Sequence, residues 1–156
     1  MSDKKVIAVL GSTGAQGSGL VSAILADANG GFAVRAITRD TSKDKAQAMS
    51  AKGADVVAAD LDDVESLKKA FAGAYGVFAV TNFWEHFSGD KEIAQARNIA
   101  EAAKAAGVKH VVWSTLEDTR TLMKADDTRM PMRQGKYRVP HFDAKAEANA
   151  HFAGLP

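Results

Sequence analysis

The sequence predicts an α/β domain built on a doubly wound parallel sheet, and three observations support this fold class. Short apolar runs alternate with amphipathic ones, a glycine-rich turn follows the first apolar run, and 156 residues are enough for one domain. Strands and helices in strict alternation specify a parallel sheet with helices on both faces. We expect five strands in the order 3-2-1-4-5 and treat residues 1–156 as one domain.

The first half of the chain contains two strand–helix units. Residues 6–10 form a continuous apolar run, as expected of a strand buried on both faces. The run 19–26 has helical spacing and is followed by a glycine pair that ends the helix. Residues 32–38 predict the second strand, and residues 43–52 the second helix.

The second half repeats the unit until the pattern breaks. It predicts strands at 54–58, 75–80 and 108–114 and helices at 62–71, 90–106 and 141–152. Between the last strand and the last helix, the polar stretch 116–140 shows no periodicity. A loop of this length is unusual in a compact domain and often belongs to a functional site.

Composition limits the classes of partner. The 20 basic and 19 acidic residues nearly cancel, whereas proteins that bind nucleic acid through its phosphates usually carry a basic excess, so no such binding is expected. The absence of cysteine and the spacing of the four histidines argue against a metal site. The first apolar run is too short to span a membrane. We expect a cytoplasmic protein, or a nuclear one if it is a eukaryotic regulator.

A glycine motif, Gly11-Ser-Thr-Gly14-Ala-Gln-Gly17, stands between the first strand and the first helix. Gly11 permits a tight turn, Gly14 lets the backbone approach a pyrophosphate, and Gly17 lets the helix pack closely on the sheet. The helix N-terminus then offers free N–H groups to the anion. The motif predicts a Rossmann dinucleotide site, with a purely structural turn as the alternative. Expected contacts are Gly11, Thr13, Gly14, Ala15, Gln16 and Gly17.

The end of the second strand favours NADP(H) over NAD(H). NAD sites usually place an acid there to bind the ribose 2′-hydroxyl, but this sequence has Thr38 followed by Arg39. An arginine can grip a 2′-phosphate with two hydrogen bonds, whereas a carboxylate repels it. Asp40 is the competing candidate, but one step later it should point away from the ribose. Arg35 and Lys43 could add positive charge.

Two further strand ends contribute candidate residues. Asp60 and Leu61 follow the third strand, where the adenine would lie, although Asp60 could instead cap the next helix. Thr81 and Asn82 follow the fourth strand, beside the crevice through which the rest of the cofactor must pass. The aromatic cluster that comes next either lines a surface or packs under the long loop; it consists of Phe83, Trp84, His86 and Phe87.

Six segments together resemble the NmrA-like family of atypical short-chain dehydrogenases/reductases: GSTGAQG, VRAITRD, GADVVAADLDD, VFAVTNFWE, GVKHVVWSTLED and VPHFDAKAE. The resemblance runs from Lys5 to about Phe152. It implies an NADP(H)-binding Rossmann domain in which Arg39 meets the 2′-phosphate and Lys145 contacts the nicotinamide ribose. Several relatives are regarded as redox sensors that regulate a partner protein, and others are quinone or isoflavone reductases.

The sequence departs from the family pattern at the catalytic position. The wider superfamily places a tyrosine four residues before the lysine, and this chain has His141 there. A lysine can lower the high pKa of a tyrosine, whereas a histidine beside Lys145 would tend to be neutral. Ser114 matches the superfamily's serine. His141, Ser114 and Lys145 are therefore the candidate catalytic residues.

The sequence also resembles only the cofactor half of its relatives, which usually continue into a small substrate-binding domain. The last strand is then expected to be an exposed edge through which the chain could form oligomers. Three functions stay open: a dinucleotide-sensing regulator with little or no catalysis, an NADPH-dependent reductase, and a structural domain with a vestigial glycine turn.

Overall fold

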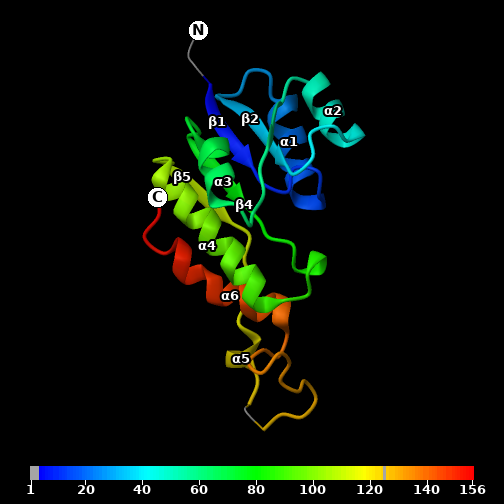
Figure 1. Cartoon of the computed structure of the whole chain (residues 1–156), viewed down its shortest axis with the longest axis vertical. Coiled ribbons are helices and arrows are strands. Elements are labelled where there is room, and N and C mark those ends of the chain that lie inside the picture. Colours follow the sequence, from blue (N-terminus) through cyan, green and yellow to red (C-terminus); the bar gives the residue numbers. More distant parts are fainter. Residues whose placement is uncertain (1–3, 125) are drawn as a thin grey trace.

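The computed structural model describes residues 4–124 and 126–156, and a parallel five-stranded sheet forms its centre (Figure 1). The strand order is β3-β2-β1-β4-β5, which confirms the predicted topology. Every strand pairs in parallel with its neighbours. The strands are β1 (Lys5–Val9), β2 (Phe32–Thr38), β3 (Asp55–Ala58), β4 (Gly76–Ala79) and β5 (His110–Trp113).

Helices cover both faces of this sheet, as the alternation of strands and helices predicts. They are α1 (Ala15–Ala26), α2 (Asp44–Ala51), α3 (Val64–Phe71), the short 3-10 helix η1 (Phe83–Glu85), α4 (Gly89–Ala105), α5 (Thr119–Leu122) and α6 (Pro140–Phe152). None of the helices formed by the described residues combines the length and apolar character that a membrane span requires.

Two apolar cores correspond to the two faces. One contains Val21 of α1 and Val34 of β2, with Met49 of α2 packed against it. The other is larger and contains Leu67 of α3 and Ile99 of α4, with Phe152 of α6 packed against it. The crossover helices α1 and α2 therefore lie on one face, and α3, α4 and α6 lie on the other.

Two helix starts differ from the prediction. Helix α1 begins at Ala15 instead of Gly19, because the glycines in its first turns lower helix propensity and hid the true start. Helix α3 begins at Val64 instead of Asp62. Its N-cap is Asp63, whose carboxylate accepts hydrogen bonds from the backbone N–H groups of the next turn.

The segment 116–140 is more ordered than its composition predicts. It contains the single turn α5, and Tyr137 near its end is fully buried. The Arg138 guanidinium donates to the backbone carbonyls of Lys124, Asp127 and Met130, which closes the segment on itself. Figure 1 shows this segment extending from the carboxyl end of the sheet, beyond α6.

Strand β5 is the sheet edge that the sequence predicts. It pairs with β4 on one side, and Val112 is about half exposed on it. On the open side, the Val111 N–H donates to the Pro156 carbonyl oxygen at 2.8 Å. The edge is thus partly satisfied by the chain's own C-terminal residue.

Candidate functional site

The glycine turn lies at the carboxyl end of β1 and has the backbone that its sequence predicts. Gly11 has φ +58°, in the left-handed region that favours glycine, and its carbonyl accepts a hydrogen bond from Gly14 N at 2.9 Å. A Cβ on Gly17 would overlap the Gly11 carbonyl, so only glycine fits there. The buried Ser12 fixes the turn to β2, because its Oγ donates to the Ile37 carbonyl at 2.8 Å.

The N-terminus of α1 is suited to an anion. Its N-cap is Gly14, and its first turn contains no acidic residue. The other helices of eight or more residues, α2, α3, α4 and α6, all carry an acid in the first turn, which offsets the positive end of the helix dipole. Among these longer helices of the described residues, α1 alone has no acid in its first turn, and Thr13, Ala15 and Gln16 lie around its N-terminus. This arrangement matches the geometry in which pyrophosphates bind.

At the end of β2, Thr38 is half-buried and Arg39 is exposed. Arg39 forms a two-point ion pair with Glu85 of η1, in which Nη1 lies 3.0 Å from Oε2 and Nη2 lies 3.1 Å from Oε1. Asp40 instead accepts from the backbone and side chain of Ser42, which lower its pKa. The prediction that Asp40 points away from the ribose stays a prediction. No sequence signal singled out Glu85.

Arg35 and Lys43, the two other basic residues considered near Arg39, lie in different surroundings. The Arg35 side chain pairs with Asp55 and donates to the carbonyls of Ala70 and Ala72, so it serves the packing of α3 and not the site. Lys43, in contrast, lines an open hollow between the glycine turn and α2, together with Thr13, Ser42, Asp44 and Lys45.

At the end of β3, Asp60 and Leu61 have different surroundings. The Asp60 carboxylate is exposed and, among the described residues, accepts a local bond from Asp62 N alone. The alternative that Asp60 caps α3 is wrong, since Asp63 is the cap. Leu61 is half-buried against the larger core, and its carbonyl accepts from Asn98 Nδ2. Asp60 therefore stays available to a ligand.

At the end of β4, Thr81 lies in a buried polar cluster with Lys145 and Glu92. Lys145 Nζ donates to the Thr81 carbonyl at 3.0 Å and to Thr81 Oγ1 at 2.8 Å, and pairs with Glu92 Oε1 at 2.9 Å. Thr81 Oγ1 also donates to Glu92. An ammonium group has three protons, and these contacts use all of them. Glu92, fully buried on α4, was not predicted, and its Oε2 has no hydrogen-bond partner among the described residues.

The three candidate catalytic residues are not joined to one another. Ser114 Oγ donates to Gln16 Oε1 of the glycine turn at 2.9 Å. His141 packs against Trp84 and Phe83, with ring centroids 4.8 Å and 5.7 Å away. In the described part of the chain, no hydrogen bond links His141 with Ser114 or Lys145.

The aromatic cluster after β4 divides into buried and exposed members. Phe83 is buried, whereas Trp84 and Phe87 are 59% and 61% exposed and contact each other edge to face. Asn82 caps η1, because its side-chain oxygen accepts from Trp84 N. The cluster therefore has one buried ring, which packs on His141 of α6, and two rings at the surface.

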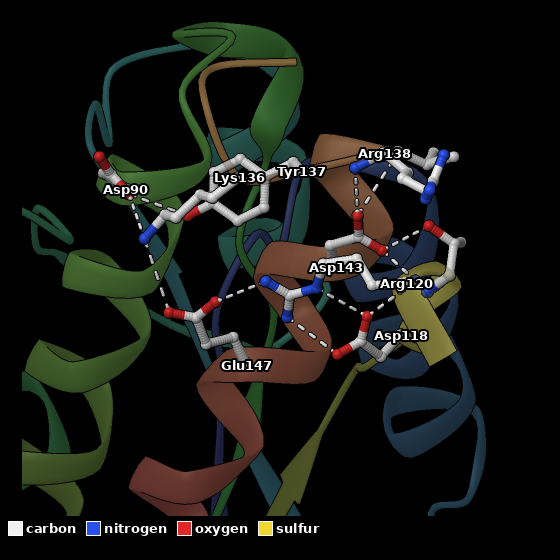
Figure 2. A network of polar contacts seen from close by, with 10 residues as sticks. Asp90, Asp118, Arg120, Lys136, Tyr137, Arg138, Asp143 and Glu147 are labelled. Atoms are coloured by element: carbon white, nitrogen blue, oxygen red, sulfur yellow. Dashed lines mark hydrogen bonds and ion pairs between the residues drawn. The ribbon is translucent and has the colours of Figure 1, made fainter. Parts of the chain in front are cut away.

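A network of charged residues fastens the segment 116–140 to α4 and α6 (Figure 2). Arg120 lies between Asp118 and Glu147, and Lys136 pairs with Asp90 at 2.9 Å. Hydrogen bonds from Arg120 lower the pKa of Asp118, and the bond from the ammonium group of Lys136 lowers the pKa of Asp90. These ion pairs hold the segment 116–140 against α4 and α6.

The buried members of the same network are Tyr137 and Asp143. Burial raises the pKa of Tyr137, whose hydroxyl donates to Asp90 Oδ1 at 2.8 Å. The Asp143 carboxylate is fully buried and accepts from the N–H groups of Thr119, Arg138 and Val139. The described residues include no cluster of three or more His, Asp or Glu that could hold a metal ion.

Comparison with known proteins gives a family match. The model of the NmrA-like family matches residues 3–152. The chain is 40% identical over 116 residues to the NmrA-like family domain-containing oxidoreductase malD of Malbranchea aurantiaca, covering 72% of this chain and 34% of malD. It is 34% identical to himF of Aspergillus japonicus, covering 97% of this chain and 43% of himF.

Solved structures show the same fold. The negative transcriptional regulator NmrA in complex with NADP has a TM-score of 0.71 and 26% identity, covering 99% of this chain and 44% of that one. The NAD complex of NmrA has a TM-score of 0.72 and 27% identity, with the same coverages. The NADPH-dependent quinone oxidoreductase QOR2 of Escherichia coli, complexed with NADPH, has a TM-score of 0.66 and 25% identity, with coverages of 96% and 46%. The chain spans less than half the length of these proteins.

Proposed function

The chain belongs to the NmrA-like family, and from that premise we propose that it binds NADP(H) and acts as a dinucleotide-sensing regulator with little or no catalysis. The observation that carries the proposal is the glycine turn. It opens a helix whose first turn has no acid, and it lies beside the exposed Arg39 at the end of β2. Both NADP(H) and NAD complexes are known among its structural relatives.

The proposed contacts follow the strand ends. The pyrophosphate is bound by the turn from Gly11 to Gly17, and the 2′-phosphate by Arg39, with Thr38 below it and Lys43 nearby. Asp60 and Leu61 border the adenine. Thr81, Asn82 and Lys145 lie toward the nicotinamide end.

Replacing Arg39 with methionine should test the NADP(H) preference. Hydrogen bonds to a charged group contribute about 1.5–3 kcal/mol, so the affinity for NADPH should fall about tenfold or more. The affinity for NADH should change little, because NADH has no 2′-phosphate. Calorimetric titrations of the wild-type chain and the Arg39→Met variant with NADPH and NADH measure these affinities. Equal affinity of the wild-type chain for NADH and NADPH would contradict the NADP(H) assignment.

Two observations favour a sensor over an enzyme. The Lys145 ammonium group is engaged by Thr81 and Glu92, and His141 stands where active relatives have a tyrosine. A bound nicotinamide would supply a hydride, but among the described residues His141 has no hydrogen bond to Ser114 or Lys145, and the Lys145 ammonium group pairs with the buried Glu92. Turnover of NADPH with quinones at ordinary enzyme rates would overturn the sensor proposal.

An NADPH-dependent reductase is the second candidate, favoured by Ser114 and its bond to Gln16 of the glycine turn. If this candidate is right, His141→Ala should reduce quinone-dependent NADPH oxidation about a hundredfold, within the usual range for loss of a general acid. NADPH affinity should be retained, which a titration of the same variant checks. Unchanged turnover in the His141→Ala variant would show that His141 is not catalytic.

A further inference from the structure

The ion pair between Arg39 and Glu85 places a carboxylate on the guanidinium group that the proposed function assigns to the 2′-phosphate. We propose that Glu85 determines dinucleotide specificity by competing with the 2′-phosphate for Arg39. This inference rests on the proposed function and adds a residue to it, together with the chemical class of ligand to which that residue responds: 2′-phosphorylated adenosine.

The geometry of the pair supports direct competition. Nη1 and Nη2 of Arg39 face the two carboxylate oxygens of Glu85, at 3.0 Å and 3.1 Å. This is the two-point arrangement by which arginine also binds phosphate, so one guanidinium edge cannot serve both anions in this way. Asn82 Nδ2 donates to Glu85 Oε1 at 3.2 Å and helps to hold the carboxylate in place.

The ion pair between Arg39 and Glu85 is weak enough for a phosphate ligand to displace Glu85. The side chains of Arg39 and Glu85 are 64% and 43% exposed, and ion pairs this open to water stabilise a protein only slightly. A phosphate carries more charge than a carboxylate and therefore binds the guanidinium more strongly. Glu85 thus lowers the affinity for 2′-phosphorylated ligands and leaves the site able to bind them.

Displacement of Glu85 also affects its neighbour in η1, Trp84. Glu85 is the last residue of η1, and Trp84 beside it packs on His141 with ring centroids 4.8 Å apart. Release of Glu85 from Arg39 should therefore change the surroundings of the Trp84 indole. Binding of a 2′-phosphate to Arg39 would in this way also affect the exposed pair Trp84 and Phe87, which contact each other.

The test compares 2′,5′-ADP with 5′-AMP, two probes that differ only in the 2′-phosphate. Glu85→Gln keeps the size of the side chain and removes its charge. We expect this variant to bind 2′,5′-ADP about two- to fivefold more tightly, which is the range that an exposed ion pair can contribute. Binding of 5′-AMP should stay the same. Glu101→Gln on α4 makes the same charge change at a carboxylate that faces Lys68, and it should alter neither affinity.

A second variant pair separates competition from a general charge effect. In an Arg39→Met background, Glu85→Gln should no longer tighten 2′,5′-ADP binding. In a Trp113→Phe background, which leaves Trp84 as the single tryptophan, 2′,5′-ADP should shift the fluorescence of Trp84 more than 5′-AMP does.

The outcomes distinguish the two proposals. If the wild-type chain binds NADPH and prefers 2′,5′-ADP, but Glu85→Gln leaves that affinity unchanged or weakens it, the competition is wrong and the NADP(H) site stands. Equal tightening in the Glu101→Gln control or in the Arg39→Met background would also overturn it. If the wild-type chain binds neither NADPH nor 2′,5′-ADP, the proposed function fails and this inference fails with it.

Discussion

Replacing Asp143 with alanine is expected to lower the free energy of unfolding by about 3 kcal/mol or more, because it leaves several buried donors without a partner. Oδ1 accepts from Thr119 N at 2.8 Å and from Thr119 Oγ1 at 2.6 Å. Oδ2 accepts from Arg138 N at 2.7 Å and from Val139 N at 3.1 Å. One carboxylate thus joins both ends of the segment 116–140 to α6 (Figure 2).

Urea unfolding of the variant and the wild-type chain measures this loss through the transition midpoint and slope. Asp143→Asn should cause an intermediate loss of stability. The amide of asparagine keeps one oxygen acceptor, but its NH2 group replaces the second acceptor and faces backbone N–H groups that are themselves donors. Glu147→Ala is the matched control on the same helix. Glu147 is partly exposed and pairs with Arg120, so its loss should cost less than about 1 kcal/mol. Equal effects of Asp143→Ala and Glu147→Ala would refute the central role of Asp143.

The sequence was sufficient for the sheet and for the glycine turn, because their signals are local. A continuous apolar run such as Val6 to Leu10 indicates burial on both faces, and alternation of strands with helices predicts the topology. The turn from Gly11 to Gly17 is recognisable because each glycine meets a backbone demand of its own. The position of Arg39 follows from the end of β2.

The polar contacts around the crevice could not be predicted, since each joins residues far apart in the sequence. Glu92 looks like an ordinary acid in the first turn of a helix, and only the fold brings Lys145 against it. Asp143 looks like a first-turn acid as well, yet its donors come from Thr119 and from the residues just before α6. Glu85 gives no local sign that it faces Arg39 across the sheet.

The segment 116–140 illustrates the same limit. Its polar composition predicts an irregular loop, and its order comes from Tyr137, whose ring packs against Gly89 and whose hydroxyl reaches Asp90. A buried tyrosine of this kind is not visible in a sequence without periodicity. In the proposed regulator, the segment 116–140 at the carboxyl end of the sheet is therefore held against α4 and α6 by side-chain contacts.

Replacing Gly17 with alanine is expected to weaken NADPH binding at least about tenfold and to destabilise the fold by about 1–3 kcal/mol, the usual range for overpacking. The added Cβ would overlap the carbonyl group of Gly11 and approach the Leu10 carbonyl oxygen at 2.9 Å. These are backbone atoms and cannot rotate away as a side chain would. Helix α1 must then move off the end of β1, which displaces the N–H groups proposed to bind the pyrophosphate.

Gly19 provides the matched control, because it lies on the same helix and a Cβ there would have nothing within 4 Å. Gly19→Ala should be neutral or stabilise the protein by up to about 1 kcal/mol, since alanine loses less backbone entropy in a helix than glycine does. Thermal unfolding and NADPH titration of both variants separate the two effects. Gly17→Ala with unchanged affinity and stability would show that α1 can shift without cost, and the close approach of α1 to the glycine turn would no longer explain the motif.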